Sequence, residues 1–417
     1  MSRLNEFEYT MSSCNHCGQC KWILPSRMHG WDFSEICPIY KHYGFDAYSG
    51  QGLINIAKER MNGVLEYGDG LEDMLYACSA CGACDVNCKS VRDMELLETI
   101  YALREDCVEA GYIPEALRVT TRNIEEEHNI YGLPHEDRFA FLKGVEIEEC
   151  ECDTVLFVGC SAYRHPENIL AAIKILQKGG VKFRLLHEEE WCCGSSLWRT
   201  GQRAEAEKLI RRNCETFSRL GVKRIITICA ECYGSFRSIY PRFVATEFET
   251  VHISEIAAEL LRDGKLQLKP QDKAIRVTYH DPCMLGRLSE PYVHWEGIIK
   301  PYGIHEPEKQ WRRGEHGQYS APRDVLNSIP GIELVEMPRS LEESFCCGAG
   351  GGTSAVNPKL AAITADERRR EALSVEAELL VSSCPFCQDA LDADGEHSIR
   401  YADLCVLLAD SLQGGEI

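Results

Sequence analysis

The cysteine content constrains this chain more than any other feature. Its 417 residues include 23 cysteines, an odd number, and its first residues lack the cationic start and apolar core of a secretory signal. Because the cytosol keeps thiols reduced, this count argues against a disulfide framework and favours bound metal. No apolar run reaches the length of a membrane-spanning helix. We therefore expect a cytoplasmic protein that associates with a membrane only through its partners.

The charge balance excludes two classes of partner. Asp and Glu number 65 against 45 Lys and Arg, so the formal net charge is −20. Such a chain repels the phosphates of nucleic acids and the headgroups of anionic lipids. We therefore expect no nucleic-acid partner.

Two cysteine motifs near the N-terminus have the spacing of a two-cluster ferredoxin. One is C-x2-C-x2-C with a fourth cysteine after 16 intervening residues, and the other is C-x2-C-x2-C-x3-C. Three thiolates at this spacing wrap one face of a cubane [4Fe-4S] cluster, and in two-cluster ferredoxins the fourth ligand comes from the other motif. The spacing therefore predicts two cubane clusters with crossed ligands. The sets are Cys14, Cys17, Cys20 and Cys88 for one cluster, and Cys78, Cys81, Cys84 and Cys37 for the other.

A pair of zinc sites is the alternative, because C-x2-C is also half of many zinc sites. Zinc is usually held by pairs of ligands, whereas two triplets, each with a fourth cysteine, fit iron and sulfide better. Two departures from bacterial ferredoxins leave the crossover open. The spacer before Cys37 has 16 residues rather than three, and Lys89 stands where a proline commonly follows the last cysteine.

The rest of the chain contains an internal duplication. TVLFVGC, WCCG, IITICAEC and HISEIAAELL in the first copy correspond to RVTYHDPC, FCCG, ELLVSSCPFC and YADLCVLLADSL in the second. Vicinal cysteines rarely serve one tetrahedral zinc well, so these pairs suit a larger cluster with several irons. Five cysteines recur in each copy. They are Cys160, Cys192, Cys193, Cys229 and Cys232 in the first, and Cys283, Cys346, Cys347, Cys384 and Cys387 in the second.

Each copy alternates strand-like and helical patterns. TVLFVG, VKFRLL and RIITIC are short apolar runs, separated by two stretches with helical spacing that end at glycines. This rhythm predicts small α/β domains with parallel sheets, whose ligands gather where strands end. Residues 94–107 and 114–127 instead have helical patterns.

The predicted fold class is therefore α+β or α/β, in three parts. Residues 1–150 form a mostly helical ferredoxin-type module with two [4Fe-4S] clusters. Residues 151–268 and 269–417 form two duplicated small α/β domains, the second with an insertion at about 288–317.

The pattern C-x31-CC-x35-C-x2-C followed by a second copy resembles the cysteine-rich CCG domains of heterodisulfide reductases. HDPCMLGR, QYSAPRDVLNSIPGIELVEMP and FCCGAGGG also resemble that family. With the two-cluster module in front, the chain is similar to the type in which ferredoxin and catalytic parts share one polypeptide. Similar chains occur as iron-sulfur subunits of glycolate and lactate oxidases and of class II (tungsten-type) benzoyl-CoA reductase complexes.

The resemblance implies one or two further [4Fe-4S] clusters, of noncubane type, on the five-cysteine sets. In the family such a cluster cleaves a disulfide, so the second set, from Cys283 to Cys387, is catalytic if that chemistry occurs here. Small residues near the sets let backbone N–H groups approach cluster sulfurs, and the candidates are Gly194, Gly348 and Gly350. Met284 stands where the family commonly has His, which weakens the case for disulfide chemistry.

These features predict an iron-sulfur oxidoreductase subunit that passes electrons through its cubane clusters to the CCG-bound clusters within a larger complex. The alternatives are a disulfide reductase that acts directly at a noncubane cluster, and a zinc-scaffolded structural protein. No G-x-G-x-x-G follows a strand, so we expect flavin and nicotinamide only on partners. The resemblance implies redox partners such as a flavoprotein, an acyl-CoA reductase-type catalytic subunit or a membrane haem subunit, and an anaerobic lifestyle.

Several residues fall outside these sets. The insertion contains four aromatic residues and forms either a partner-docking surface or a self-packed loop. They are Tyr292, Trp295, Tyr302 and Trp311.

We expect five histidines to have surface or capping roles: His16, His165, His187, His252 and His280. His280 is the exception to watch, because it lies three residues before Cys283. Packing thiols are the default for the ungrouped cysteines on helices. The ungrouped cysteines are Cys107, Cys150, Cys152, Cys214 and Cys405.

Overall fold

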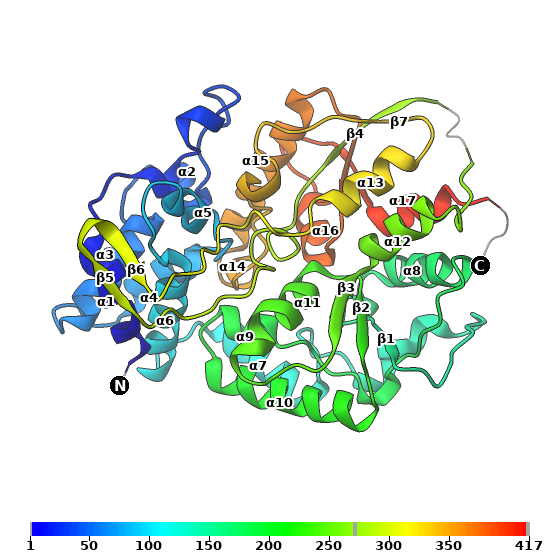
Figure 1. The fold of residues 1–417 in the computed structure, drawn as a ribbon, viewed down its shortest axis with the longest axis horizontal. Helices are drawn as coiled ribbons and strands as arrows, with labels where there is room; N and C mark the ends of the chain where they lie inside the picture. The colour runs from blue at the N-terminus through cyan, green and yellow to red at the C-terminus, as the bar shows by residue number, and fades with distance from the viewer. Residues whose placement is uncertain (1, 270–272, 414–417) are drawn as a thin grey trace.

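The computed structural model describes residues 2–269 and 273–413, which form helices and mostly parallel sheets (Figure 1). The first part is helical, as the sequence predicts. Its longer helices follow one another through short turns, and several end at glycines in left-handed conformation, such as Gly44 after the second helix. The helices are α1 (Glu8–Ser13), α2 (Pro38–Tyr43), α3 (Gly50–Met61), α4 (Asp69–Ala77), α5 (Ala83–Lys89), α6 (Leu96–Glu109) and α7 (Glu115–Glu127).

Helix α6 is the centre of this part of the molecule. It is buried on almost all sides, and its polar residues Glu98 and Arg104 are fully buried together with the apolar ones. A helix buried all round needs partners for every polar side chain. Glu98 and Arg104 find theirs in other parts of the chain, as described below.

The first sheet contains three parallel strands in the order β1-β2-β3. The strands are β1 (Thr154–Phe157), β2 (Arg224–Thr227) and β3 (Glu249–His252), with Val155 paired to Ile225 and Ile225 to Thr250. The helices around them are α8 (Pro166–Lys178), α9 (Ser195–Arg199), α10 (Arg203–Arg219), α11 (Ala230–Gly234) and α12 (Ile253–Arg262).

The strand predicted for VKFRLL does not form. Only Arg184 pairs with β1, through a single bridge to Val155. The backbone groups on either side of Arg184 bond instead to the segment before β1. The carbonyl of Phe183 accepts from the N–H of Cys150, and the N–H of Leu185 donates to the carboxylate of Glu149. These bonds hold the segment at the edge of the sheet without extending the ladder.

The second sheet repeats the first with one strand added. Its order is β7-β4-β8-β9, all parallel. By chain order β4, β8 and β9 correspond to β1, β2 and β3, and β7 occupies the edge that the Arg184 bridge occupies in the first copy. The elements are β4 (Ile275–Tyr279), β7 (Ile332–Leu334), β8 (Leu379–Ser382), β9 (Arg400–Asp403), α13 (Ser320–Ser328), α14 (Thr353–Val356), α15 (Pro358–Ser374), α16 (Pro385–Leu391) and α17 (Leu404–Asp410).

The two sheet-containing halves share one apolar core. Helix α8 of the first half packs against α17 of the second, and α12 packs against α13. One buried cluster includes Ile169 of α8, Val277 of β4 and Leu408 of α17. The apolar side chains buried between the two halves fix them against each other.

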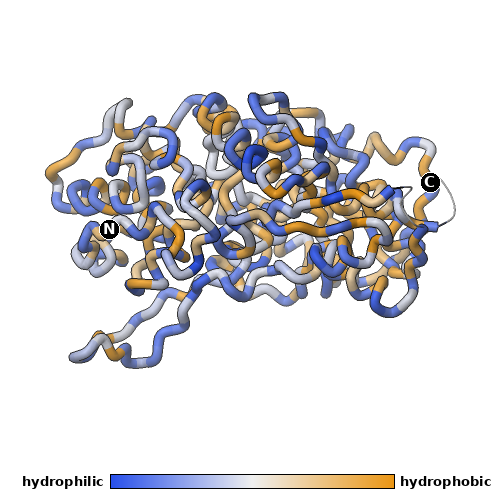
Figure 2. The backbone as a smooth tube through the Cα atoms, turned by 90° about the horizontal axis from the view of Figure 1, so that it is seen from above, coloured by the Kyte–Doolittle hydropathy of each residue, from blue (hydrophilic) through white to orange (hydrophobic). Residues whose placement is uncertain are grey.

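The insertion forms an antiparallel hairpin of β5 (Ile298–Lys300) and β6 (Ile304–Glu306). It lies over the N-terminal helices in Figure 1 and stands clear of the body in Figure 2, where the hydrophilic residues after β6 are blue. Within the described ranges, no helix is both long and apolar enough to cross a bilayer.

Candidate metal centres

The first predicted cubane set comes together near the surface. Cys17 is exposed, Cys14 is half-buried, and Cys20 and Cys88 are buried. Burial raises the pKa of Cys88, and the charge of Asp85 and then those of Cys20, Cys17 and Cys14 raise it further. The three cysteines of the first motif are thus electrostatic neighbours of the last cysteine of the second.

The second predicted cubane set lies deeper. Cys37, Cys78, Cys81 and Cys84 all line one small cavity, with Gly50 and Ile100 beside them. Burial raises the pKa of Cys37, and Cys78, Cys20 and Cys81 raise it further. Only the start of α3 separates this set from the first one. A Cβ on Gly50 would lie 3.0 Å from Cys84 Cβ and 3.4 Å from Cys20 Cβ, so the glycine leaves room for both cysteines.

Lys89, which replaces the common proline, has a structural role. Its ammonium is fully buried and donates to Asp85 at 2.9 Å and to Glu95 at 2.7 Å. The pair of carboxylates outweighs burial and raises the pKa of Lys89. This residue therefore ties α5 to the start of α6.

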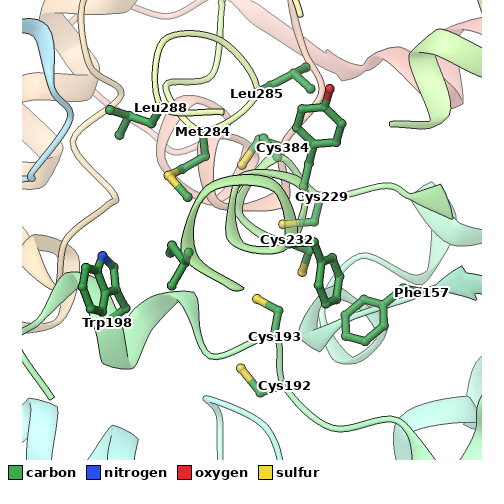
Figure 3. Packing of buried hydrophobic residues seen from close by; sticks show 14 of the residues in the cluster. Phe157, Cys192, Cys193, Trp198, Cys229, Cys232, Met284, Leu285, Leu288 and Cys384 are labelled. Carbon is green, nitrogen blue, oxygen red and sulfur yellow. The ribbon is translucent and has the colours of Figure 1, made fainter. Parts of the chain in front are cut away.

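The first five-cysteine set forms a chain of sulfur contacts. Cys192 is hydrogen-bonded to both Cys160 and Cys193, and Cys232 to both Cys193 and Cys229. Figure 3 shows four of these sulfurs in a row that leads toward Cys384. The bonds from Cys192 and Cys232 lower the pKa of Cys193 below the ordinary value of a thiol. The N–H of Gly194 donates to Cys192 Sγ at 3.4 Å.

The second five-cysteine set has a similar arrangement. Cys347 is hydrogen-bonded to Cys346 and Cys387, which lower its pKa well below the usual value of a thiol. Cys283 is the fifth member, and burial raises its pKa to about 12. The N–H of Gly348 donates to Cys346 Sγ at 3.2 Å.

Gly350 lies beside the side chain of Arg199. A Cβ at this position would lie 2.7 Å from Nη2 of Arg199, so the glycine makes room for that guanidinium. Met284 is buried against Gly234 of α11, where a Cβ on the glycine would lie 2.7 Å from Met284 Cε. The methionine thus fills the junction between the two halves.

His280 is the histidine that joins a sulfur site. One of its ring nitrogens lies within 4.8 Å of the sulfurs of Cys347 and Cys387. Burial, followed by the charge of Arg368, lowers the pKa of His280 to about 3, and Arg368 donates to its Nδ1 at 3.1 Å. The imidazole is therefore neutral. The signal in the sequence was its place in HDPC, before Cys283.

The other histidines have the expected surface or capping roles. His252 caps α12 through a bond to the N–H of Ser254, and burial lowers its pKa to about 4. His16, His165 and His187 are bonded to Asn55, Asp389 and Glu149.

The remaining cysteines lie outside the four sets. Cys150 and Cys152 form a disulfide in the segment before β1, which the sequence did not predict. A bend in the chain at Glu151, the residue between them, brings the two sulfurs together, with Cα atoms 5.3 Å apart. Cys107 and Cys405 are buried packing thiols, and Cys214 is half-buried on α10.

Two contacts connect neighbouring sets. Cys81 of the second cubane set is hydrogen-bonded to Cys346, and the hydroxyl of Ser79 lies 3.2 Å from the same sulfur. Cys229 of the first five-cysteine set is hydrogen-bonded to Cys384 of the second. The four sets therefore follow one another from the exposed Cys17 to the first CCG half.

Buried charges hold the three parts together around these sets. Arg104 donates to carbonyls from all of them: Leu75 at 2.8 Å, Arg199 at 2.6 Å, Gly351 at 2.9 Å, and Cys78. Arg199 in turn pairs with Glu231 and donates to Ser79 O at 3.0 Å.

Glu98 is the second charged residue buried in α6. It pairs with Arg242 at 2.7 Å, with Arg312 at 3.2 Å and with Arg3 at 3.9 Å. Burial alone would raise the pKa of Glu98, but the three guanidiniums outweigh it and lower the pKa to about 2. The carboxylate is therefore charged and links distant parts of the chain.

A cavity lies between the two sheet-containing halves, which are called the CCG halves below. It has a volume of about 440 Å³. Glu231, between Cys229 and Cys232, and Phe386, between Cys384 and Cys387, both line it. Tyr131 and Phe386 also line the small cavity around the first five-cysteine set. The pocket thus borders both sets.

The aromatic residues of the insertion do not form one surface. The ring of Tyr292 contacts the guanidiniums of Arg242 and Arg312, and Trp295 donates to the carbonyl of Pro307 at 2.8 Å. Tyr302 at the hairpin tip is fully exposed, and Trp311 is 41 % exposed. Part of the insertion is therefore self-packed, and part faces outward.

The donor set fits iron-sulfur clusters. Buried soft thiolates with lowered pKa values at Cys193, Cys347 and Cys384, accompanied by N–H donors, suit Fe–S ligation. The chain also matches the model of the 4Fe-4S dicluster domain over residues 10–91, and the model of the CCG cysteine-rich domain over residues 154–237 and 311–392. These matches favour iron over the zinc alternative.

Relatives that match most of this chain are also iron-sulfur or reductase proteins. The chain is 33% identical to a subunit of the dihydromethanophenazine:CoB–CoM heterodisulfide reductase of Methanosarcina barkeri, over 96% of this chain and 94% of that protein. It is 28% identical to EtfAB:quinone oxidoreductase of Syntrophomonas wolfei, over 82% of this chain and 47% of the relative. It is 29% identical to a subunit of the fumarate reductase (CoM/CoB) of Methanothermobacter marburgensis, over 81% and 62%. The predicted resemblance is confirmed, and the chain belongs to the heterodisulfide reductase family of iron-sulfur oxidoreductase subunits.

Proposed function

We propose that this chain carries electrons between a redox partner and the pocket between its CCG halves. The observation that supports this most directly is the order of the four cysteine sets. The exposed Cys17 marks the outer end, the Cys81–Cys346 contact lies in the middle, and the Cys229–Cys384 contact lies beside the pocket.

The proposed division of the chain is the one predicted from the sequence. Residues 1–150 would hold two cubane clusters on the crossed sets, 151–268 the first CCG set, and 269–417 the second. Bound clusters would supply one-electron transfer. The protein's part is to exclude water, donate N–H groups from Gly194 and Gly348, and balance charge with buried arginines.

The second candidate is a disulfide reductase, in which both electrons go to a disulfide bound in the pocket. The pocket of about 440 Å³ between the CCG sets favours it, because a relay alone needs no such space. Met284 is buried at the junction of the halves and offers no proton, while His280 is neutral beside Cys347 and Cys387.

The redox partner would dock where the first cubane set reaches the surface. Cys17 is exposed there, with Cys14 half-buried beside it. Partners of the classes implied by the resemblance, a flavoprotein, an acyl-CoA reductase-type subunit or a haem subunit, each carry a centre able to exchange electrons with this face.

Metal analysis and spectroscopy test the proposal. Anaerobically purified protein should contain about 12 to 16 irons, with as much acid-labile sulfide, for three or four clusters. Reduction by a low-potential viologen should develop paramagnetic cluster signals in steps. A protein with zinc and no sulfide, or with iron that no viologen reduces, contradicts the electron-transfer function.

A panel of thiols separates the two candidates. A new signal in the oxidised protein that needs a particular thiol, and is lost in Cys346→Ser, supports direct disulfide chemistry. Signals that no thiol alters support the relay.

A further inference from the structure

His280 is held in place directly after β4 by its backbone. Its N–H donates to the carbonyl of Val381 at 2.8 Å, and its carbonyl accepts from the hydroxyl of Ser382 at 3.0 Å. The residue is 1 % exposed, and one of its ring nitrogens lies within 4.8 Å of the sulfurs of Cys347 and Cys387. The imidazole is therefore part of the surroundings of the second five-cysteine set.

Arg368 determines which nitrogen of this ring carries the proton. Its Nε–H donates to His280 Nδ1 at 3.1 Å. A guanidinium has only donors and keeps its protons in proteins, so Nδ1 must offer a lone pair. An imidazolium carries N–H groups on both nitrogens and could not accept this bond. The ring of His280 is thus neutral, with its proton on Nε2.

The neighbours of Arg368 fix the guanidinium in this orientation. Arg368 is fully buried, and its Nη1 donates to the carbonyl of Arg339 at 2.8 Å and to the carboxylate of Glu371. Its Nη2 donates to Ser344 Oγ at 3.2 Å. Glu371 also accepts from Arg339 Nε at 3.1 Å. Rotation of Arg368 away from Nδ1 would break several buried hydrogen bonds, which is costly, so the tautomer of His280 is fixed as well.

This tautomer argues against a bond from His280 to iron. A histidine that binds a metal through one nitrogen usually donates the N–H of the other to a carboxylate, a carbonyl or water. In His280 the second nitrogen instead accepts from a cation. Ligation through Nε2 would require the ring to lose its remaining proton. A hydrogen bond from Nε2–H to sulfur requires no such loss, because cysteine sulfur accepts hydrogen bonds.

The two five-cysteine sets differ at this position. The residue three places before the first cysteine is His280 in the second copy and Phe157 in the first. Phe157 is buried at the end of β1 and its side chain has no donor. Hydrogen bonds to the sulfurs of a cluster raise its reduction potential, because they stabilise the more negative reduced state. The first set therefore lacks a contribution that His280 can make to the second.

We propose that His280 donates its Nε2–H to the sulfurs of the second five-cysteine set and raises the reduction potential of the cluster there, without binding iron itself. The inference rests on the proposed function, because it requires a cluster on this set. It assigns to Arg368 the positioning of the imidazole that donates.

Two substitutions separate the roles of the ring nitrogens in the anaerobic holoprotein. Asn can accept from Arg368 in place of Nδ1 but has no donor in place of Nε2, whereas the longer Gln can offer an amide N–H there. We expect His280→Asn to lower the equilibrium constant for one-electron reduction of the second CCG centre about tenfold, which is about 59 mV. His280→Gln should retain most of the potential, and both variants should keep the iron content of the wild type. Redox titration followed by electron paramagnetic resonance measures the shift.

Electron–nuclear double resonance with isotopically labelled histidine checks the contact directly. We expect an exchangeable proton coupled to the second CCG centre, lost in His280→Asn, and only a weak coupling to nitrogen. The strong nitrogen coupling of an imidazole bound to iron would overturn the inference. Equal shifts of potential in the two variants, or no shift in His280→Asn, would also overturn it. Failure of the electron-transfer function would appear in the wild type itself, as clusters that viologen does not reduce.

Discussion

The hydroxyl of Ser79 lies 3.2 Å from the sulfur of Cys346, across 267 residues of sequence. Ser79 follows the first cysteine of the second cubane set, and Cys346 belongs to the vicinal pair of the second CCG set. A hydrogen bond between them places the two sets in direct contact. It also gives the hydroxyl influence over the electron density on that sulfur.

Removal of this hydroxyl should lower a reduction potential. A donor to a ligand sulfur stabilises the reduced, more negative cluster. Loss of one hydrogen bond of about 0.5–1.5 kcal/mol corresponds to roughly 20–60 mV for one electron. We expect Ser79→Ala to shift the second CCG centre by that amount, as measured by redox titration followed by electron paramagnetic resonance. Ser289→Ala, at a buried serine that donates to Gly286 O, is the control; equal shifts in both variants would contradict the assignment.

Arg104 should be essential for stability. Its guanidinium is fully buried and satisfies carbonyls from the cubane module and from both CCG halves. Arg104→Met preserves most of the volume but leaves these acceptors without a donor. We expect the free energy of unfolding of the holoprotein to fall by about 3 kcal/mol or more, as measured by urea titration. Arg118→Met should change it little, because exposed Arg118 only donates to Gly111 O and Ile113 O beside its own helix. Similar losses in both variants would refute the special role of Arg104.

The crossed ligand sets predict which pairs of cysteine variants affect the same cluster. Cys88→Ser should alter the same paramagnetic signal as Cys14→Ser, because Cys88 lies among the cysteines of the first motif. Cys37→Ser should alter the same signal as Cys78→Ser. Each variant should lose up to about four irons, and Cys214→Ser on α10 should lose none. Pairing of Cys88 with Cys78 instead would show that the ligands do not cross.

The contact between His165 and Asp389 should make stability depend on pH. Burial lowers the pKa of His165, but bonds to Asp389 and then Glu167 outweigh it and raise the pKa above its ordinary value. A raised histidine pKa means that the stabilisation is complete below the unfolded value of about 6.5 and is lost as pH rises through the folded value. We expect His165→Asn to lower the urea midpoint at about pH 6 and to have a smaller effect at about pH 9. His187→Asn is the control, and an equal effect of His165→Asn at both pH values would contradict the linkage.

Much of the site could be predicted from local spacing. The four cysteine groups depend on intervals of a few residues, and strands β1 and β2 and helices α6 and α7 have clear periodic patterns. His280 was marked by its position before Cys283. Local chemistry determines these features, so one sequence is enough to find them.

Contacts between the parts could not be predicted in this way. Arg104 and Arg199 look like ordinary helical cations in the sequence, and only the packing of the parts shows that they are buried beside the cysteine sets. The pocket likewise depends on how the CCG halves face each other. The missing strand at VKFRLL has the same origin, since the segment before β1 competes for its backbone groups.

The partners of Glu98 determine when the first part of this protein can be completed. Of the three arginines that pair with Glu98, one is Arg3, whereas the other two are Arg242 and Arg312. Proteins are made from the N-terminus, and early domains usually fold first. Here a ribosome must synthesise three quarters of the chain before the buried carboxylate of α6 gains its full set of cations. The ion pairs of this carboxylate therefore make the completion of the ferredoxin-type module depend on segments that are synthesised long after it.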